Sequence, residues 1–463
     1  MTETHSRSLP ASQSQSQAAT RPAVAAQLST LRGAALYIGA LLGPGLLLLP
    51  GLAAAEAGPA SVLAWTGLLL LSALFALVFA ALGRSFPSAS GVTGYVTAGL
   101  GDRAGRVTGW MFLTGVVTGA PVVCLIGAGY LTALTGGGRL AQAGVAALLL
   151  LVVLALAAFG LRTSSTAQLL LVVLLVTVVA VAVAGSARAA RAANWAPFAP
   201  HGWLAVGHAA ATLMLSFVGW EAVAPLTTRF TDPARQLPRV MAIALAVTSV
   251  LYLGLAVATI GVLGAGAGTL VPLAGLLRSA VGPAGTAAAA VAAVVLTLGA
   301  TNAYINGAAA MASALARPRL ASGDAGDAGP RRPAARLLAA IAACGLLLIT
   351  AYGLGLASPA SLVAVPVALF LGVYLGCMAA AARVLRGQAR WAALPAGVAV
   401  LVMLSYCGCA LAIPATVVAA AAIRRTPSER TRTQSPLPSR LPVNHRPACR
   451  LAGASRRLVQ RCG

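Results

Sequence analysis

Long stretches without any charged residue run through this chain, and they limit its possible folds more than any other property. Residues 107–134 and 240–264, for example, contain no Asp, Glu, Lys or Arg. A helix needs about 20 apolar residues to cross the roughly 30 Å hydrocarbon core of a bilayer. Charged residues make up only 9% of the chain, against about 25% in soluble domains. Because backbone groups in lipid must be paired internally, we predict an all-α integral membrane protein.

The apolar stretches predict about 12 transmembrane helices. The last stretch, 391–423, is long for one helix and short for two, and we divide it at Tyr406–Gly408. The predicted spans are 31–57, 60–83, 107–134, 140–160, 166–185, 205–230, 240–264, 285–316, 337–356, 362–382 and the two parts of 391–423.

The distribution of arginine predicts the orientation of these spans. All 32 basic residues are Arg, and the formal net charge is +24. With both termini in the cytoplasm, four Arg fall in outer segments, namely Arg139, Arg188, Arg191 and Arg278. This bias agrees with the excess of basic residues in cytoplasmic loops, and it explains the charge better than nucleic-acid binding does. We therefore expect a multi-pass protein of the plasma membrane.

Two polar tails flank the predicted membrane domain, 30–423. Residues 1–29 are rich in Ser, Gln and Ala and contain no apolar run, so they are not typical of a signal peptide. Residues 424–463 are rich in Arg and Pro and contain a single acid. Both compositions are typical of disordered segments, and we expect both tails to lie in the cytoplasm.

Two of the predicted spans contain residues that interrupt a helix. The first span carries Gly43-Pro44-Gly45 near its middle, and the sixth carries Phe217-Val218-Gly219-Trp220-Glu221. Glycine is conformationally free and proline lacks an N–H, and unwound backbone is tolerated in a membrane where it lines a cavity or is buried in protein. These are the first helices of two groups of five, and interruptions at corresponding positions of two halves indicate an inverted-repeat transporter with its site at the midplane. The alternative is two ordinary kinked helices, since Gly and Pro are common in membrane spans.

Glu221 is the acid that lies deepest within an apolar span. A charged residue at the centre of a bilayer costs about 2.5–3.5 kcal/mol on insertion scales, so such a residue is retained for a partner, a proton or a ligand. Removal from water favours the neutral carboxyl. The alternative is a protonated glutamate that only braces the break beside Gly219.

Polar residues elsewhere in the spans are candidates for a transport pathway. Thr114 and Thr118 lie in the third span, and Thr301 and Asn302 lie in the eighth. An amide such as that of Asn302 either joins two helices or lines the pathway, and the sequence leaves both open. The seven cysteines show no zinc-type spacing, so we predict no metal site.

Three stretches, in order, resemble the amino acid–polyamine–organocation (APC) transporter superfamily. The first is GPGLLLLP, which is similar to a family pattern of Gly, Ser or Thr, Gly, then Ile or Val and a later Pro. The second runs from Arg84-Ser85-Phe86-Pro87 to Gly109-Trp110. The third is FVGWE followed by Asp232-Pro233 and Leu237-Pro238-Arg239. Within the superfamily the chain looks closest to bacterial exporters of methionine and branched-chain amino acids.

This resemblance implies roles for the residues at both breaks. Backbone N–H groups near Gly43 and Gly45 would bind the carboxylate of an amino acid, and carbonyls from Phe217 to Gly219 would bind its ammonium. Trp220 would form a gate or wall. Glu221 would be the coupling or gating acid. The same resemblance implies a five-plus-five inverted repeat with broken first and sixth helices and two extra C-terminal helices. It also implies a secondary active transporter that works by alternating access.

Two departures from the family pattern affect this expectation. Pro44 stands where the family usually has Ser or Thr, which removes one N–H and one hydroxyl from the carboxylate site. Some relatives use a Lys in the fifth span in place of sodium, and this chain has no Lys. Proton coupling through Glu221 is therefore possible, sodium is not excluded, and no other cofactor is implied.

The remaining function classes are a membrane-embedded enzyme and a sensor built on a transporter scaffold. An enzyme would need His, Asp, Ser or metal ligands gathered at depth, and no motif of that kind occurs in the sequence. A sensor would need a soluble output domain. We therefore expect a transporter rather than an enzyme, with a small apolar amino acid such as methionine, leucine, isoleucine or valine as its substrate and the lipid bilayer as its surroundings. The sequence leaves the coupling, the direction of transport and the oligomeric state open.

Overall fold

The computed structural model describes residues 28–43, 45–86, 91–161, 165–221, 230–316 and 331–423. The chain divides into two units, Met1–Ala422 and Ile423–Gly463. The second unit lies almost wholly outside the described residues. Most of both predicted tails also falls outside them. Within the described ranges the regular elements are helices, and one isolated bridge joins Leu28 to Phe230. The predicted helical class is therefore confirmed.

The first half of the helices runs from α1 to α7. Their bounds are α1 Thr30–Leu41, α2 Gly45–Ala57, η1 Gly58–Ala60, α3 Ser61–Ser85, α4 Val92–Leu100, α5 Asp102–Thr135, α6 Arg139–Ala158 and α7 Ser165–Ser186.

The second half runs from short 3-10 turns to α15. The bounds are η2 Ala187–Ala189, η3 Ala192–Trp195, α8 Leu204–Leu213, η4 Met214–Phe217, α9 Pro233–Leu263, η6 Gly264–Gly266, α10 Pro272–Val281, α11 Ala284–Ala316, α12 Arg331–Gly353, α13 Pro359–Val384, α14 Gln388–Ser405, η7 Gly408–Leu411 and α15 Ala412–Ile423.

Nine stretches of the described chain are long and apolar enough to cross a membrane. One of them, Gly45–Ser85, is 41 residues long and contains both α2 and α3. Large apolar side chains also point outward from the middle of helices, for example Leu70 at 68%, Leu151 at 64% and Leu347 at 69% exposure. Water would disfavour such a surface, whereas lipid tails match it. The chain is therefore a multi-pass membrane protein.

The first predicted span is interrupted where the sequence places the interruption. α1 ends at Leu41, and α2 starts at Gly45. In the sixth predicted span, α8 is followed directly by the 3-10 turn η4. The next residue, Val218, has an extended backbone with φ −71° and ψ 121°. Residues 222–229, which would form the rest of that span, lie outside the described residues, as does Pro44.

The structure differs from the predicted spans in two short helices. α4 and α10 lie in segments that the apolar pattern treats as loops, because each has about 10 residues and cannot cross a bilayer. The last stretch is interrupted at Tyr406–Gly408 as predicted, since α14 ends at Ser405 and η7 begins at Gly408. The helix that follows, α15, has 12 residues and is not among the nine stretches of the described chain that are long enough to cross a membrane.

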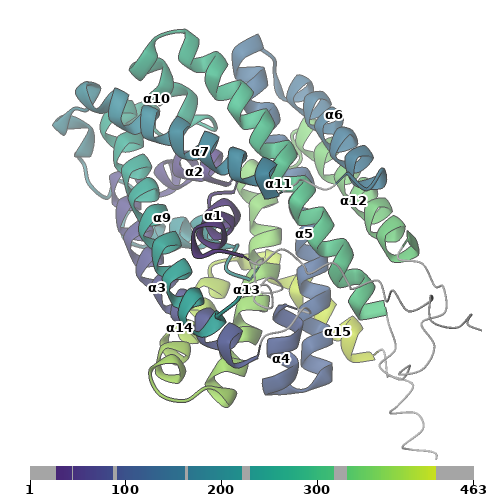
Figure 1. Cartoon of the computed structure of the whole chain (residues 1–463). Helices are drawn as coiled ribbons and strands as arrows, with labels where there is room; N and C mark the ends of the chain where they lie inside the picture. The colour runs from purple at the N-terminus through teal and green to yellow at the C-terminus, as the bar shows by residue number, and fades with distance from the viewer. Residues whose placement is uncertain are drawn as a thin grey trace, which may run out of the picture. The chain divides into compact units, whose positions relative to one another are not determined.

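Helices from both halves of the chain surround the interrupted segments. Figure 1 shows α1 within the bundle beside α7 and α9, with α6 and α12 side by side at an edge. α5 packs against both α11 and α13. This arrangement brings side chains from three long helices to the two breaks.

Candidate functional site

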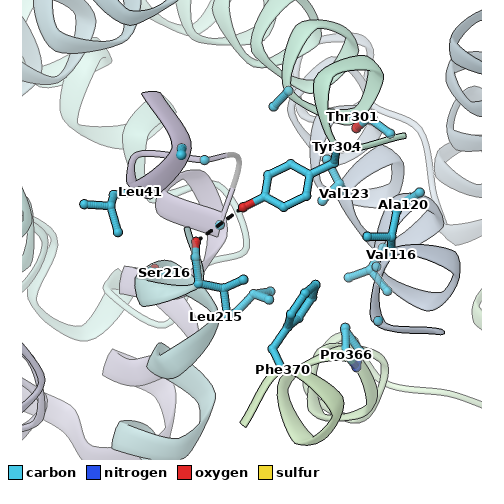
Figure 2. A pocket seen from close by; sticks show the side chains of 18 residues that line it. Leu41, Val116, Ala120, Val123, Leu215, Ser216, Thr301, Tyr304, Pro366 and Phe370 are labelled. Carbon is cyan, nitrogen blue, oxygen red and sulfur yellow. Dashed lines mark hydrogen bonds between the residues drawn. The ribbon is translucent and has the colours of Figure 1, made fainter. Parts of the chain in front are cut away.

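A cavity of about 80 Å³ lies where the two interrupted segments meet (Figure 2). On the same measure a water molecule needs at least about 10–15 Å³, so the cavity has room for more than one water molecule. Its lining is mostly glycine and apolar side chains, with hydroxyl groups from Ser216, Thr301 and Tyr304. The lining residues are Ala40, Leu41, Gly43, Gly45, Gly115, Val116, Gly119, Ala120, Val122, Val123, Leu215, Ser216, Val218, Ala300, Thr301, Tyr304, Pro366 and Phe370.

The two interrupted segments touch each other through Gly219. A Cβ atom at this position would lie 2.7 Å from the carbonyl oxygen of Ala40 and 3.0 Å from the backbone nitrogen of Leu41. The φ angle of Gly219 is +154°, which side chains of L-residues rarely adopt. The segment after η4 therefore reaches the end of α1 because residue 219 has no side chain.

Three tyrosines from three other helices donate hydrogen bonds to successive carbonyls of the second break. Tyr252 of α9 bonds the carbonyl of Ser216 at 2.6 Å, and Tyr374 of α13 bonds the carbonyl of Phe217 at 2.9 Å. The hydroxyl of Tyr304 lies 3.5 Å from the carbonyl of Val218 and points toward the breaks in Figure 2. Each bond supplies a donor to a carbonyl that a continuous helix would have paired with an N–H group.

Four of the predicted site residues line the cavity. Gly43 and Gly45 come from the first break, Val218 from the second, and Thr301 from α11. The hydroxyl of Thr301 is buried and has no hydrogen-bond partner among the described residues, and the same holds for Ser216. A Cβ atom at Gly43 would meet only the carbonyl oxygen of Ala40, at 3.8 Å, whereas one at Gly45 would lie 3.1 Å from Cδ1 of Leu49.

Phe217 and Trp220 are buried beside the cavity but do not line it. The ring of Phe217 packs against Trp65 and Tyr252 with centroids 6.0 and 5.2 Å apart. The indole N–H of Trp220 donates to the hydroxyl of Ser72 in α3 at 2.8 Å. These contacts anchor the second break against α3 and α9.

Glu221 is 2% exposed and lies outside the cavity lining. Its Oε2 atom accepts hydrogen bonds from the backbone N–H of Gly219 at 2.9 Å and from the hydroxyl of Tyr374 at 2.6 Å. Its Oε1 atom is buried without a partner among the described residues. Since Tyr374 also bonds the carbonyl of Phe217, one hydroxyl hydrogen faces two acceptors.

The other predicted pathway residues, Thr114, Thr118 and Asn302, are not among the residues that line the cavity. Thr118 donates its hydroxyl to the carbonyl of Thr114 within α5, at 2.9 Å, and neither residue lines the cavity. Asn302 donates to the carbonyl of Leu161 at 3.0 Å, beyond the end of α6. This bond joins α11 to the segment that follows α6.

The cavity wall also contains residues that the sequence reasoning missed. Gly115 and Gly119 of α5 face the cavity, and Phe370 of α13 lies over Gly115, where a Cβ would be 3.1 Å from the ring. The four-residue spacing of the two glycines is a signal for close helix packing that could have identified them. Tyr304 follows Thr301 by three residues and so lies on the same face of α11.

Comparison with known proteins identifies the family. The amino acid permease family profile matches residues 28–444, which includes both breaks and every helix that lines the cavity. The chain belongs to the amino acid permease family. Its members are transporters rather than enzymes, so a small-molecule amino acid substrate follows at the level of the family.

Individual relatives differ in substrate. The permease is 33% identical to the uncharacterised amino acid permease YecA of Bacillus subtilis (strain 168), over 86% of this chain and 95% of that protein. It is 34% identical to the L-methionine/branched-chain amino acid exporter YjeH of Escherichia coli (strain K12), over 49% of this chain and 54% of that one. It is 28% identical to human cationic amino acid transporter 4, over 49% of this chain and 39% of that protein. The relatives therefore do not settle the substrate class, and the residues of the site are the remaining basis for inferring it.

Proposed function

We propose that this permease is a secondary active transporter of small apolar amino acids, such as methionine, leucine, isoleucine and valine. The observation that carries the proposal is the composition of the cavity wall. Among the described residues that line it, the side chains are apolar or hydroxyl-bearing, and none is charged. A cationic or anionic substrate side chain would be buried there without a partner, which is costly. Val116, Ala120 and Phe370 offer an apolar surface instead.

The backbone at the two breaks supports binding of the amino acid's common part. The N-terminus of α2 begins at Gly45 in the cavity wall, and the N-terminal N–H groups of a helix favour anions such as a carboxylate. Leu41, Ser216 and Val218 line the same cavity from segments whose carbonyls are not all used within a helix, and such carbonyls favour an ammonium. Pro44 lies outside the described residues, and its effect on the carboxylate site stays a prediction.

The finer architecture is part of the same proposal. Twelve spans in a five-plus-five inverted repeat, with broken first and sixth helices, would put the cavity at the midplane of the bilayer. The arginine distribution supports a plasma-membrane protein with both termini in the cytoplasm. Resemblance to the exporter YjeH across 49% of the chain supports export.

Competition for uptake tests the substrate class. In proteoliposomes that contain the purified permease, unlabelled methionine, isoleucine and valine should inhibit the transport of labelled leucine, whereas arginine and putrescine should not. The expected preference is at least about 100-fold, since burying an unpaired charge costs several kcal/mol. If arginine or a polyamine competes better than leucine, the proposed class is wrong.

We further propose that Glu221 carries the proton that couples transport to a pH gradient. When Glu221 is ionised, the single hydrogen of the Tyr374 hydroxyl serves either the carboxylate or the carbonyl of Phe217. When Oε2 is protonated, the carboxyl can donate to Tyr374, and Tyr374 can donate to Phe217 at the same time. Protonation would therefore give both the Glu221 carboxyl and the Phe217 carbonyl a hydrogen-bond partner. It would thereby shift the equilibrium between two conformations of the second break.

Glu221→Gln tests the proton role. Glutamine has nearly the same shape and resembles the neutral carboxyl, since its amide can donate to Tyr374. We expect the variant to bind substrate within about 3-fold of wild type but to lose the pH dependence of transport. The relevant range is about pH 5 to 8, where a carboxyl removed from water can change its protonation state. Initial rates of both proteins across that range are the measurement.

An unchanged pH profile in the Gln variant would mean that Glu221 only braces the break. Sodium is then the second candidate for coupling. The observation that favours it is the pair of buried hydroxyls, Ser216 and Thr301, that line the cavity and have no hydrogen-bond partner within the described part of the chain. Sodium binds through oxygen ligands, so replacing sodium by potassium on one side of the membrane would separate the two ions.

A further inference from the structure

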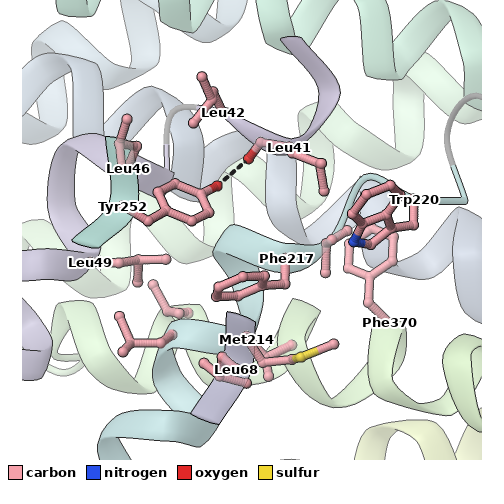
Figure 3. Close-up of a cluster of buried hydrophobic side chains, with 14 of the residues drawn as sticks. Leu41, Leu42, Leu46, Leu49, Leu68, Met214, Phe217, Trp220, Tyr252 and Phe370 are labelled. Carbon is pink, nitrogen blue, oxygen red and sulfur yellow. Dashed lines mark hydrogen bonds between the residues drawn. The ribbon is translucent and has the colours of Figure 1, made fainter. Parts of the chain in front are cut away.

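The hydroxyl of Tyr252 connects the two interrupted segments directly. It lies 2.5 Å from the carbonyl oxygen of Leu41, at the end of α1, and 2.6 Å from the carbonyl oxygen of Ser216, in η4. Figure 3 shows Tyr252 reaching Leu41 beside the Phe217 ring. The two carbonyls belong to residues that are 175 positions apart in the numbering of the chain, between 41 and 216, and both residues line the cavity.

The tyrosine ring is held in place independently of its hydroxyl. It is 1% exposed and packs against Trp65 and Phe217, with centroid distances of 5.0 and 5.2 Å. A change from tyrosine to phenylalanine would therefore keep the packing and remove only the link between the segments.

The point where Tyr252 joins the segments has more acceptors than donors. A hydroxyl has one hydrogen, so the two carbonyls of Leu41 and Ser216 share it. The side-chain oxygen of Ser216 is 2% exposed at the residue level and has no partner among the described residues. Buried acceptors without donors are costly. A ligand that brings several N–H groups, as a primary ammonium does, would supply the missing donors.

We propose that Tyr252 is a positioning residue for the substrate ammonium. Its hydroxyl fixes the spacing of the Leu41 and Ser216 carbonyls, so that one ammonium group in the cavity can donate to both segments. This inference rests on the proposed function, because it assumes that an amino acid binds between the breaks. It adds that recognition of the amine depends on a side chain of α9, which does not itself line the cavity.

Tyr252→Phe is the test, and two ligands give it a specific readout. One is the transported amino acid, for example leucine, and the other is its 2-hydroxy analogue, which keeps the carboxylate and side chain but has no ammonium. In wild type the amino acid should compete much better than the analogue. In the variant the inhibition constant of the amino acid should rise by roughly 10-fold, as expected for weakened hydrogen bonds to a charged group, while that of the analogue should change by less than about 2-fold.

Tyr352→Phe is the matched control. Tyr352 is 3% exposed and donates its hydroxyl to the Oε1 atom of Gln142 at 2.6 Å, and neither residue lines the cavity between the breaks. The control variant loses a comparable bond in the same membrane domain. It should keep the wild-type preference for the amine.

The outcomes separate this inference from the proposed function. Competition by a panel of amino acids is first measured on the wild-type protein. A preference for arginine would overturn the proposed substrate class. The role of Tyr252 would then be tested with arginine and its 2-hydroxy analogue. If Tyr252→Phe weakens both ligands equally, or neither, the positioning role is wrong. If no amino acid competes in wild type, both proposals fall. Thermal unfolding of the detergent-solubilised variant, measured with and without ligand, shows whether Tyr252→Phe is folded.

Discussion

Gly219→Ala is expected to reduce transport roughly 10- to 100-fold, because overpacking a close-packed site costs about 1–3 kcal/mol. The new methyl group would lie 2.7 Å from the carbonyl oxygen of Ala40 and 2.8 Å from its carbonyl carbon. Both are backbone atoms, so no rotamer change can make room. The two breaks would have to separate, and the φ of +154° would be strained as well. Uptake of labelled leucine into proteoliposomes measures the loss.

A second glycine provides the control for this substitution. Gly67 lies in α3, and a Cβ atom there would meet nothing within 4 Å. Gly67→Ala should therefore transport at the wild-type rate. Both variants should elute from a sizing column as wild type does, which separates a local effect from misfolding. Wild-type transport by Gly219→Ala would contradict the close approach of the two segments.

Gly45→Val is expected to reduce transport by a similar factor, roughly 10- to 100-fold by the same packing argument. Gly45 begins α2 in the cavity wall, and a Cβ atom there would lie 3.1 Å from Cδ1 of Leu49 and 3.7 Å from Oγ of Ser216. The branched side chain would fill the space in front of the helix N-terminus, where the substrate carboxylate is proposed to bind. Equilibrium binding of labelled substrate to the purified variant is the measurement.

Gly45→Ala separates this effect from a general intolerance of side chains at position 45. Its single methyl group meets the end of the Leu49 side chain, which can move, so a loss of less than about 10-fold is expected. Normal substrate binding by the valine variant would show that the carboxylate lies elsewhere.

Much of the membrane architecture could be predicted from local chemistry. Apolar stretches of about 20 residues must be helical in lipid, and the observed α3, α6 and α11 begin and end within two residues of the predicted spans. The interruption between Leu41 and Gly45 follows from two glycines and a proline in a row. The short helices α4 and α10 were missed because apolar length was the criterion.

The cavity wall could be predicted only in part. Gly43, Gly45 and Val218 line it, as the interruptions indicated, and so does Thr301. On α5, however, Gly115 and Gly119 face the cavity, whereas Thr114 and Thr118 do not. One residue along a helix turns a side chain by about 100°, and the apolar pattern of a membrane helix gives little indication of which side faces the protein.

The helical membrane class, the position of the first break and the apolar character of the chain can be predicted from the sequence, since each depends on residues that are neighbours along the backbone. The pairing of the carbonyls of the second break depends on how the helices pack, because Tyr252, Tyr304 and Tyr374 come from three distant helices. Helix packing also places Glu221 outside the cavity, bonded to Tyr374. A hydrogen bond between segments so far apart in the chain depends on how the helices pack, and packing is a property of the whole bundle.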